Sequence, residues 1–207
     1  MLFYQICFIL INVILDKYAR FSPFNPKYES IRILNYSIWS IGAIFALLGG
    51  DYENGFLFIS NTLIFSYLYE LYFHTPDKSH TIHHTIAIIG MIIGYLSGIY
   101  KFTWVQQLTL ITYAALSTSI LSSMRNIVEL EPYKNNIKQV YYWYYIIIKI
   151  TAMILHYIII YKKRDFIQNS GEFTSYHIIA LIIFLCIHIT QLYFTYLITK
   201  RIKATQI

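Results

Sequence analysis

The feature that most constrains this sequence is a series of apolar segments, most of them about 20 residues long. An apolar helix needs about 20 residues to cross the hydrocarbon core of a bilayer. Seven such segments occupy most of the chain, at residues 2–15, 31–50, 55–74, 81–100, 102–124, 140–161 and 173–199. The first is short, but it has neither a basic n-region nor a small-x-small cleavage site, so we expect a helix and not a signal peptide. The pattern predicts an all-α integral membrane protein, a bundle of about seven transmembrane helices.

The composition excludes an ordinary soluble domain, because 57% of the 207 residues are hydrophobic and only 13% are charged. The connections are short and carry turn residues. We expect a first short transmembrane helix and a basic cytosolic loop at 1–30, a transmembrane domain at 31–199, and a short basic cytosolic tail at 200–207. Cys7 and Cys186 lie inside apolar runs, which suits buried free thiols better than a disulfide or a zinc site.

The formal net charge of +6 is better explained by membrane topology than by nucleic-acid binding, since the basic residues lie in the connections. Eleven Lys and Arg residues fall on one side of the alternating connections and four on the other, and with Lys149 inside a segment these make up the 16. The positive-inside rule then predicts a lumenal or exterior N-terminus and a cytosolic C-terminus. The sixth connection, which carries Lys162, Lys163 and Arg164, is the exception.

Polar side chains gather at the ends of three consecutive segments that alternation brings to the cytosolic side. They are Glu70 in the third segment, His80, His83 and His84 in the fourth, and Ser117, Thr118, Ser122, Ser123 and Arg125 in the fifth. Ionisable groups within a membrane are costly and are usually functional. Simpler explanations stay open: interfacial histidines, hydroxyls that serve helix packing, and an Arg125 that snorkels to the headgroups.

A second polar set lies deeper in the last two segments. Lys149 and His156 are seven residues apart, and His177 and His188 are eleven apart, so each pair shares one face of its helix. Together with Gln191 they could line a cavity that runs up from the cytosolic cluster, or they could form hydrogen bonds between helices. The sequence leaves both interpretations open.

The order of three motifs resembles the TLC-domain family, multispanning proteins mostly of the endoplasmic reticulum that include ceramide synthases. The motifs are "YLYEL", "IHHTIAIIG" and "LSTSILSSMR" on successive segments. The resemblance is closer to the small members of the family than to ceramide synthases, which have a His-Asp and a further Asp where this chain has neither. It implies lipid metabolism, an endoplasmic reticulum location, and a site built from Glu70, His83 and His84. The tail "KRIKATQI" carries no retention signal.

Acyl transfer to a lipid amine or hydroxyl is the first functional hypothesis. His83 or His84 would be the general base or acyl carrier, oriented by Glu70. Acyl-CoA is the candidate substrate, with no cofactor firmly implied, and Arg125 could hold a phosphate of the donor. The substrate-binding candidates are Ser117, Thr118, Arg125, Lys149, His156 and His188.

Three alternatives remain. The chain could be a non-catalytic protein that binds lipid, regulates membrane composition or handles cargo, with membrane lipids as partners and a homo-oligomer left open. Metal chemistry is suggested by "HTIHH", but the other histidines form no further His box, so no metal site is predicted. A transporter has only the intramembrane polar groups in its favour, because we find neither paired Gly- or Pro-broken helices nor an inverted repeat.

Overall fold

The described part of the chain is helical throughout, without a strand, in a computed structural model. The structure describes residues 6–7, 9–10, 13–14, 26–73, 78–99, 103–124, 133–169, 171 and 174–204. Its helices are α2 (Pro26–Gly49), α3 (Tyr52–Phe73), α4 (Lys78–Ile99), α5 (Thr103–Ala114), α6 (Ser117–Met124), α7 (Lys134–Gln168) and α8 (Thr174–Ala204).

Most of the predicted segments coincide with one helix each, but the fifth does not. The segment at 102–124 was expected to be continuous, and it is two helices, α5 and α6, separated by a turn at Ala115 and Leu116. The helices α7 and α8 also extend beyond the predicted apolar limits. Of the first segment, only residues 6–7, 9–10 and 13–14 are described, and they are helical.

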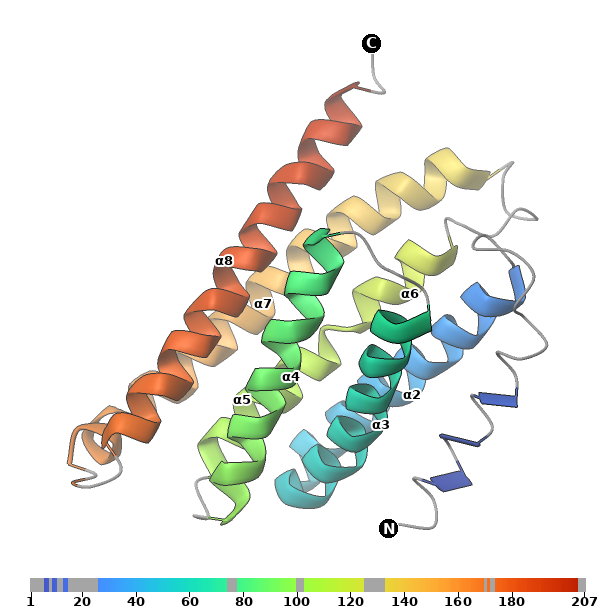
Figure 1. Cartoon of the computed structure of the whole chain (residues 1–207). Coiled ribbons are helices and arrows are strands. Elements are labelled where there is room, and N and C mark those ends of the chain that lie inside the picture. The colour runs from blue at the N-terminus through green and yellow to red at the C-terminus, as the bar shows by residue number, and fades with distance from the viewer. Residues whose placement is uncertain are drawn as a thin grey trace.

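The centre of the bundle is α5, which packs against α2, α3, α4 and α7 (Figure 1). Its buried side chains point in every direction around its axis, as expected for a helix that has neighbours on all sides. They are Trp104, Val105, Gln106, Leu108, Thr109, Leu110, Ile111 and Tyr113. The long helix α8 packs against α4 and α7 and leaves its other side open, and α6 lies against α2 and α7.

Small residues allow two close helix crossings. A Cβ on Gly55 of α3 would lie 2.3 Å from the Cβ of Ala46 on α2. A Cβ on Gly94 of α4 would lie 2.4 Å from the ring of Phe56 on α3. Both approaches are possible only because glycine has no side chain, which is a frequent arrangement in membrane helix bundles.

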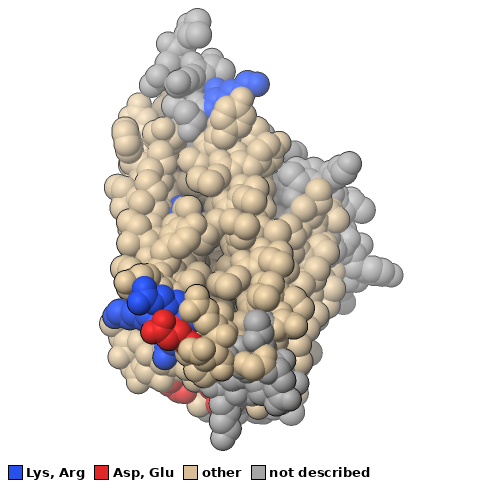
Figure 2. All heavy atoms as spheres, turned by 90° about the vertical axis from the view of Figure 1, so that its left-hand side faces the viewer, with Lys and Arg blue, Asp and Glu red and all other residues tan. Residues whose placement is uncertain are grey.

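Three helices in the described residues are long and apolar enough to cross a membrane: Arg32–Gly49, Asn135–Gln168 and Ser175–Leu197. Their outward faces carry large hydrophobic side chains that are half exposed or more, such as Phe45, Ile147 and Ile182. Figure 2 shows one face of the molecule. Charged residues lie near its two ends, and the surface between them is almost free of charge. An apolar surface of this extent is unusual for a soluble monomer. The molecule is therefore compatible with an integral membrane protein.

Candidate functional site

The predicted His pair lies in the second turn of α4, and its second member is buried against α3. His84 is 4% exposed, and its ring centroid lies 4.1 Å from that of Tyr67. Glu70 follows Tyr67 by three residues and so lies about one turn nearer the C-terminal end of α3. The backbones of Glu70 and His83 are described, but their side chains are outside the described part of the structure. Arg125 lies outside it altogether.

The turn between α5 and α6 is the main irregularity of the bundle. Its backbone is held by tight bonds, from Leu116 N–H to the Tyr113 carbonyl at 2.9 Å and from Ser119 N–H to the Leu116 carbonyl at 2.8 Å. A side chain of another helix also bonds to this backbone: the hydroxyl of Ser40 on α2 donates to the Tyr113 carbonyl at 3.3 Å. Non-helical backbone inside a helix bundle is stable where other groups satisfy its hydrogen bonds.

Lys149 of α7 also contacts this turn. Its ammonium group donates to the Ala115 carbonyl at 3.4 Å and lies 5.5 Å from the centre of the Tyr145 ring. Thr118 donates its hydroxyl to the same carbonyl at 2.9 Å. Next to them, the Tyr144 hydroxyl donates to Ser117 Oγ at 2.9 Å. Three predicted binding residues, Ser117, Thr118 and Lys149, are thus brought together at the interruption of the helix.

No carboxylate within the described residues forms a salt bridge with Lys149. The salt bridge on α7 joins Arg164 and Asp165, near the C-terminal end of the helix. On insertion scales a lysine at the centre of a membrane helix costs about 2.5–3.5 kcal/mol. A cation beside the carboxyl end of α5 recovers part of this cost, because the helix dipole places partial negative charge there. Lys149 therefore stabilises the interruption, while most of its hydrogen-bonding capacity remains unused.

His156 and His188 form a second polar group one to two turns further along α7. His156 Nδ1 is 2.8 Å from His188 Nε2, and His156 Nε2 is 2.9 Å from the Leu108 carbonyl of α5. The Thr112 hydroxyl lies 3.4 Å from the same Nε2 atom. His156 is fully buried and His188 nearly so. The pair therefore joins α5, α7 and α8 through one continuous set of hydrogen bonds.

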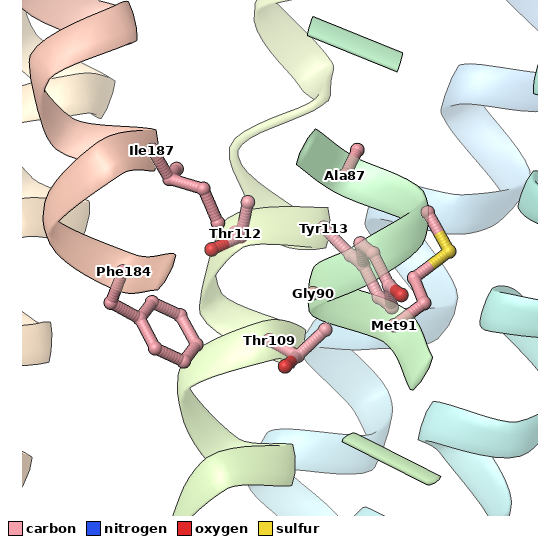
Figure 3. A pocket seen from close by; sticks show the side chains of 8 residues that line it. All are labelled: Ala87, Gly90, Met91, Thr109, Thr112, Tyr113, Phe184 and Ile187. Carbon is pink, nitrogen blue, oxygen red and sulfur yellow. The ribbon is translucent and has the colours of Figure 1, made fainter. Parts of the chain in front are cut away.

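A cavity of about 40 Å³ lies on the other side of Thr112, between α4, α5 and α8. Figure 3 shows its lining side chains arranged around a common space: Ala87, Gly90, Met91, Thr109, Thr112, Tyr113, Phe184 and Ile187. Both threonine hydroxyls donate to carbonyls of their own helix, at Val105 and Leu108. The space is therefore mainly apolar, and the His156 ring stands behind it in contact with Thr112 and Phe184.

The deeper histidines lie at two separate places along α8, and one pair forms a hydrogen bond between helices. His156 contacts His188 across two helices, whereas His177 is surrounded by the aromatic rings of Trp104, Phe166 and Tyr176 near the other end of α8. Sequence reasoning did not identify Thr112, Tyr144 or the Leu108 carbonyl. The sequence contains a signal only for the interruption of the helix. The Ser and Thr side chains of "LSTSILSS" can bond to nearby backbone carbonyls, which disfavours a regular helix.

Among the described residues, no group of three or more His, Cys, Asp and Glu side chains is placed to hold a metal ion. The molecule belongs to the class of all-helical proteins with helices that are long and apolar enough to span a membrane. Comparison with known proteins adds no narrower assignment: no protein-family model, no curated protein and no solved structure matches the chain.

Proposed function

We propose that the chain is a TLC-like integral membrane protein of lipid metabolism or lipid handling, with about seven transmembrane helices. The three long apolar helices support this proposal, and α3, α4 and the pair α5 and α6 pack alongside them. The N-terminus is lumenal and the C-terminus cytosolic, in the endoplasmic reticulum, from the distribution of basic residues and the resemblance. An N-glycosylation site added before residue 2 is then modified in microsomes, while one added after residue 207 is not. The reverse pattern would contradict this orientation.

The observation that carries lipid handling is the juxtaposition of buried polar groups with an apolar cavity. Lys149 and the pair of His156 and His188 offer polar contacts, and the cavity beside Thr112 offers an apolar one. A lipid has the same two parts, a polar headgroup and an apolar chain. We therefore infer that the chain handles membrane lipids; the cavity of about 40 Å³ has room for a small part of an acyl chain and not for a whole lipid.

Lipid retention after purification tests this function. The lipids that stay bound after exchange into lipid-free detergent are quantified by mass spectrometry for the wild type and for Gly90→Ala, which places a methyl group at the cavity wall. Gly49→Ala is the matched control, because a Cβ there meets nothing within 4 Å. We expect retention by the wild type and by Gly49→Ala, and less by Gly90→Ala. A wild-type protein that retains no lipid would contradict the proposal.

Acyl transfer is the second candidate, and the contact between Tyr67 and His84 supports it, because the helix that His84 contacts also carries Glu70, three residues after Tyr67. His83 or His84 would take the proton from an amine or hydroxyl as that group attacks the thioester carbonyl of acyl-CoA, and the CoA thiolate would leave. The test is a lipidomic comparison of cells that express wild type, His83→Ala/His84→Ala or His177→Ala at equal abundance. One acylated lipid class should rise with wild type and His177→Ala only. A rise with the double variant would exclude this mechanism.

A further inference from the structure

The surroundings of Lys149 and Ser117 contain more hydrogen-bond donors than acceptors. The ammonium group has three N–H donors and no acceptor. Its acceptor in the described structure is the Ala115 carbonyl at 3.4 Å, which is long for a charged hydrogen bond. Ser117 Oγ accepts the proton of Tyr144, so the hydroxyl proton of Ser117 is left to donate elsewhere. The two side chains lie at the same interruption, because Lys149 donates to the carbonyl of Ala115, two residues before Ser117.

Lys149 lies where an amphipathic ligand would meet it. The residue is partly buried, and it lies near the middle of α7 within the apolar stretch Asn135–Gln168. Tyr145 covers one side of the ammonium with its ring. A positive charge at this depth, with unused donors and without a carboxylate in the described residues, is complementary to an anion that carries its own apolar chain.

We propose that Lys149 and Ser117, at the interruption between α5 and α6, bind the anionic oxygen headgroup of a lipid, a carboxylate or a phosphate monoester. The headgroup accepts hydrogen bonds from the ammonium and from the Ser117 hydroxyl, and it compensates the buried charge. This inference deepens the proposed lipid handling and rests on it. Without the ligand, Lys149 caps the carboxyl end of α5 through the Ala115 carbonyl.

Lipid retention in nanodiscs tests the site. Nanodiscs of phosphatidylcholine are prepared with oleate, with oleyl alcohol or with phosphatidic acid, and native mass spectrometry counts the bound lipids. We expect the wild type to retain about ten times or more as much oleate or phosphatidic acid as oleyl alcohol. This ratio corresponds to the free energy of one charge-assisted hydrogen bond. Lys149→Met, which keeps the length of the side chain, loses this preference, and Lys149→Arg keeps it. Lys162→Met, at the exposed end of α7, is the matched control and leaves it unchanged.

The outcomes separate this inference from the function on which it rests. Equal retention of oleate and oleyl alcohol by the wild type overturns the anion site, and this result does not depend on whether a variant folds. An anionic preference that survives in Lys149→Met also overturns it and leaves Lys149 as a helix cap. Displacement of the bound lipid by inorganic phosphate alone overturns the assignment to a lipid. If the protein retains no lipid of any kind, the proposed lipid handling itself fails.

Discussion

His156 on α7 and His188 on α8 are joined by a 2.8 Å contact between Nδ1 of the first and Nε2 of the second, and the Leu108 carbonyl fixes the direction of that bond. A carbonyl can only accept, so His156 Nε2 carries a proton. In the neutral ring, His156 Nδ1 is then an acceptor. His188 Nε2 therefore donates to it, and both tautomers are determined by one backbone group.

This direction predicts an asymmetric mutational response. His188→Ala leaves the buried Nδ1 atom of His156 without its donor, whereas His156→Ala removes the same bond and also the bond to the Leu108 carbonyl. We expect both to lower the free energy of unfolding, His156→Ala more, with a coupling of about 0.6–1.7 kcal/mol in the double-mutant cycle. Unfolding in mixed micelles measures all four proteins. Additive single effects would show that the bond contributes no stability.

Two glycines one turn apart on α4 should respond to alanine in opposite ways. A Cβ on Gly94 would meet the buried ring of Phe56 at 2.4 Å, whereas a Cβ on Gly90 meets Ile183 at 3.4 Å and Ile187 at 3.8 Å. Gly94→Ala should therefore destabilise the protein by about 1–3 kcal/mol through overpacking. Gly90→Ala should be neutral or stabilising by up to about 1 kcal/mol, the difference in helix propensity. Thermal unfolding in nanodiscs measures both, and equal effects would contradict the packing around Phe56.

The sequence predicted where helices form because long apolar segments leave few alternatives in a bilayer. Hydropathy located the ends of α3 and α4 to within three residues, but it placed the start of α2 and both ends of α7 five to seven residues too far inward. That helix continues through Lys162, Lys163 and Arg164, since charged residues can extend a helix beyond the hydrocarbon. Helix formation is a local property, and local patterns describe it well.

The interruption between α5 and α6 could not be located from hydropathy, and the Ser and Thr residues of 117–123 are a weak signal for it. The stretch from 103 to 124 contains neither Gly nor Pro, the residues that usually mark a break. The break is stabilised by side chains from other helices, Ser40 of α2 and Lys149 of α7, which bond to the Tyr113 and Ala115 carbonyls. The contact between His156 and His188 depends likewise on which faces of α7 and α8 meet. Spacing within one helix carries no information about its neighbour.

The role of α2 in holding this interruption can be tested with two serines of the same helix. Ser40 donates to the Tyr113 carbonyl on α5, whereas Ser37 donates to the Ile33 carbonyl of its own helix. Ser40→Ala should lower the free energy of unfolding by about 0.6 kcal/mol, the average for a hydrogen bond between membrane helices. Ser37→Ala should have little effect, and the difference is measured in mixed micelles. A larger loss for Ser37→Ala would contradict a link between α2 and the interruption.

Two buried tryptophans provide a matched comparison of a satisfied and an unsatisfied indole N–H. Trp39 Nε1 donates to the Thr62 hydroxyl at 2.9 Å, whereas Trp104 Nε1 has no hydrogen-bond partner among the described residues. Both side chains are at most 2% exposed, so phenylalanine removes a similar buried volume from each. Leaving a buried donor unpaired costs about 1–3 kcal/mol, and Trp104→Phe removes that cost, while Trp39→Phe breaks a bond. We therefore expect Trp39→Phe to be the more destabilising, by about 1 kcal/mol or more, in thermal unfolding of the purified protein. Equal losses would mean that the Trp104 N–H has a partner in the membrane-embedded protein.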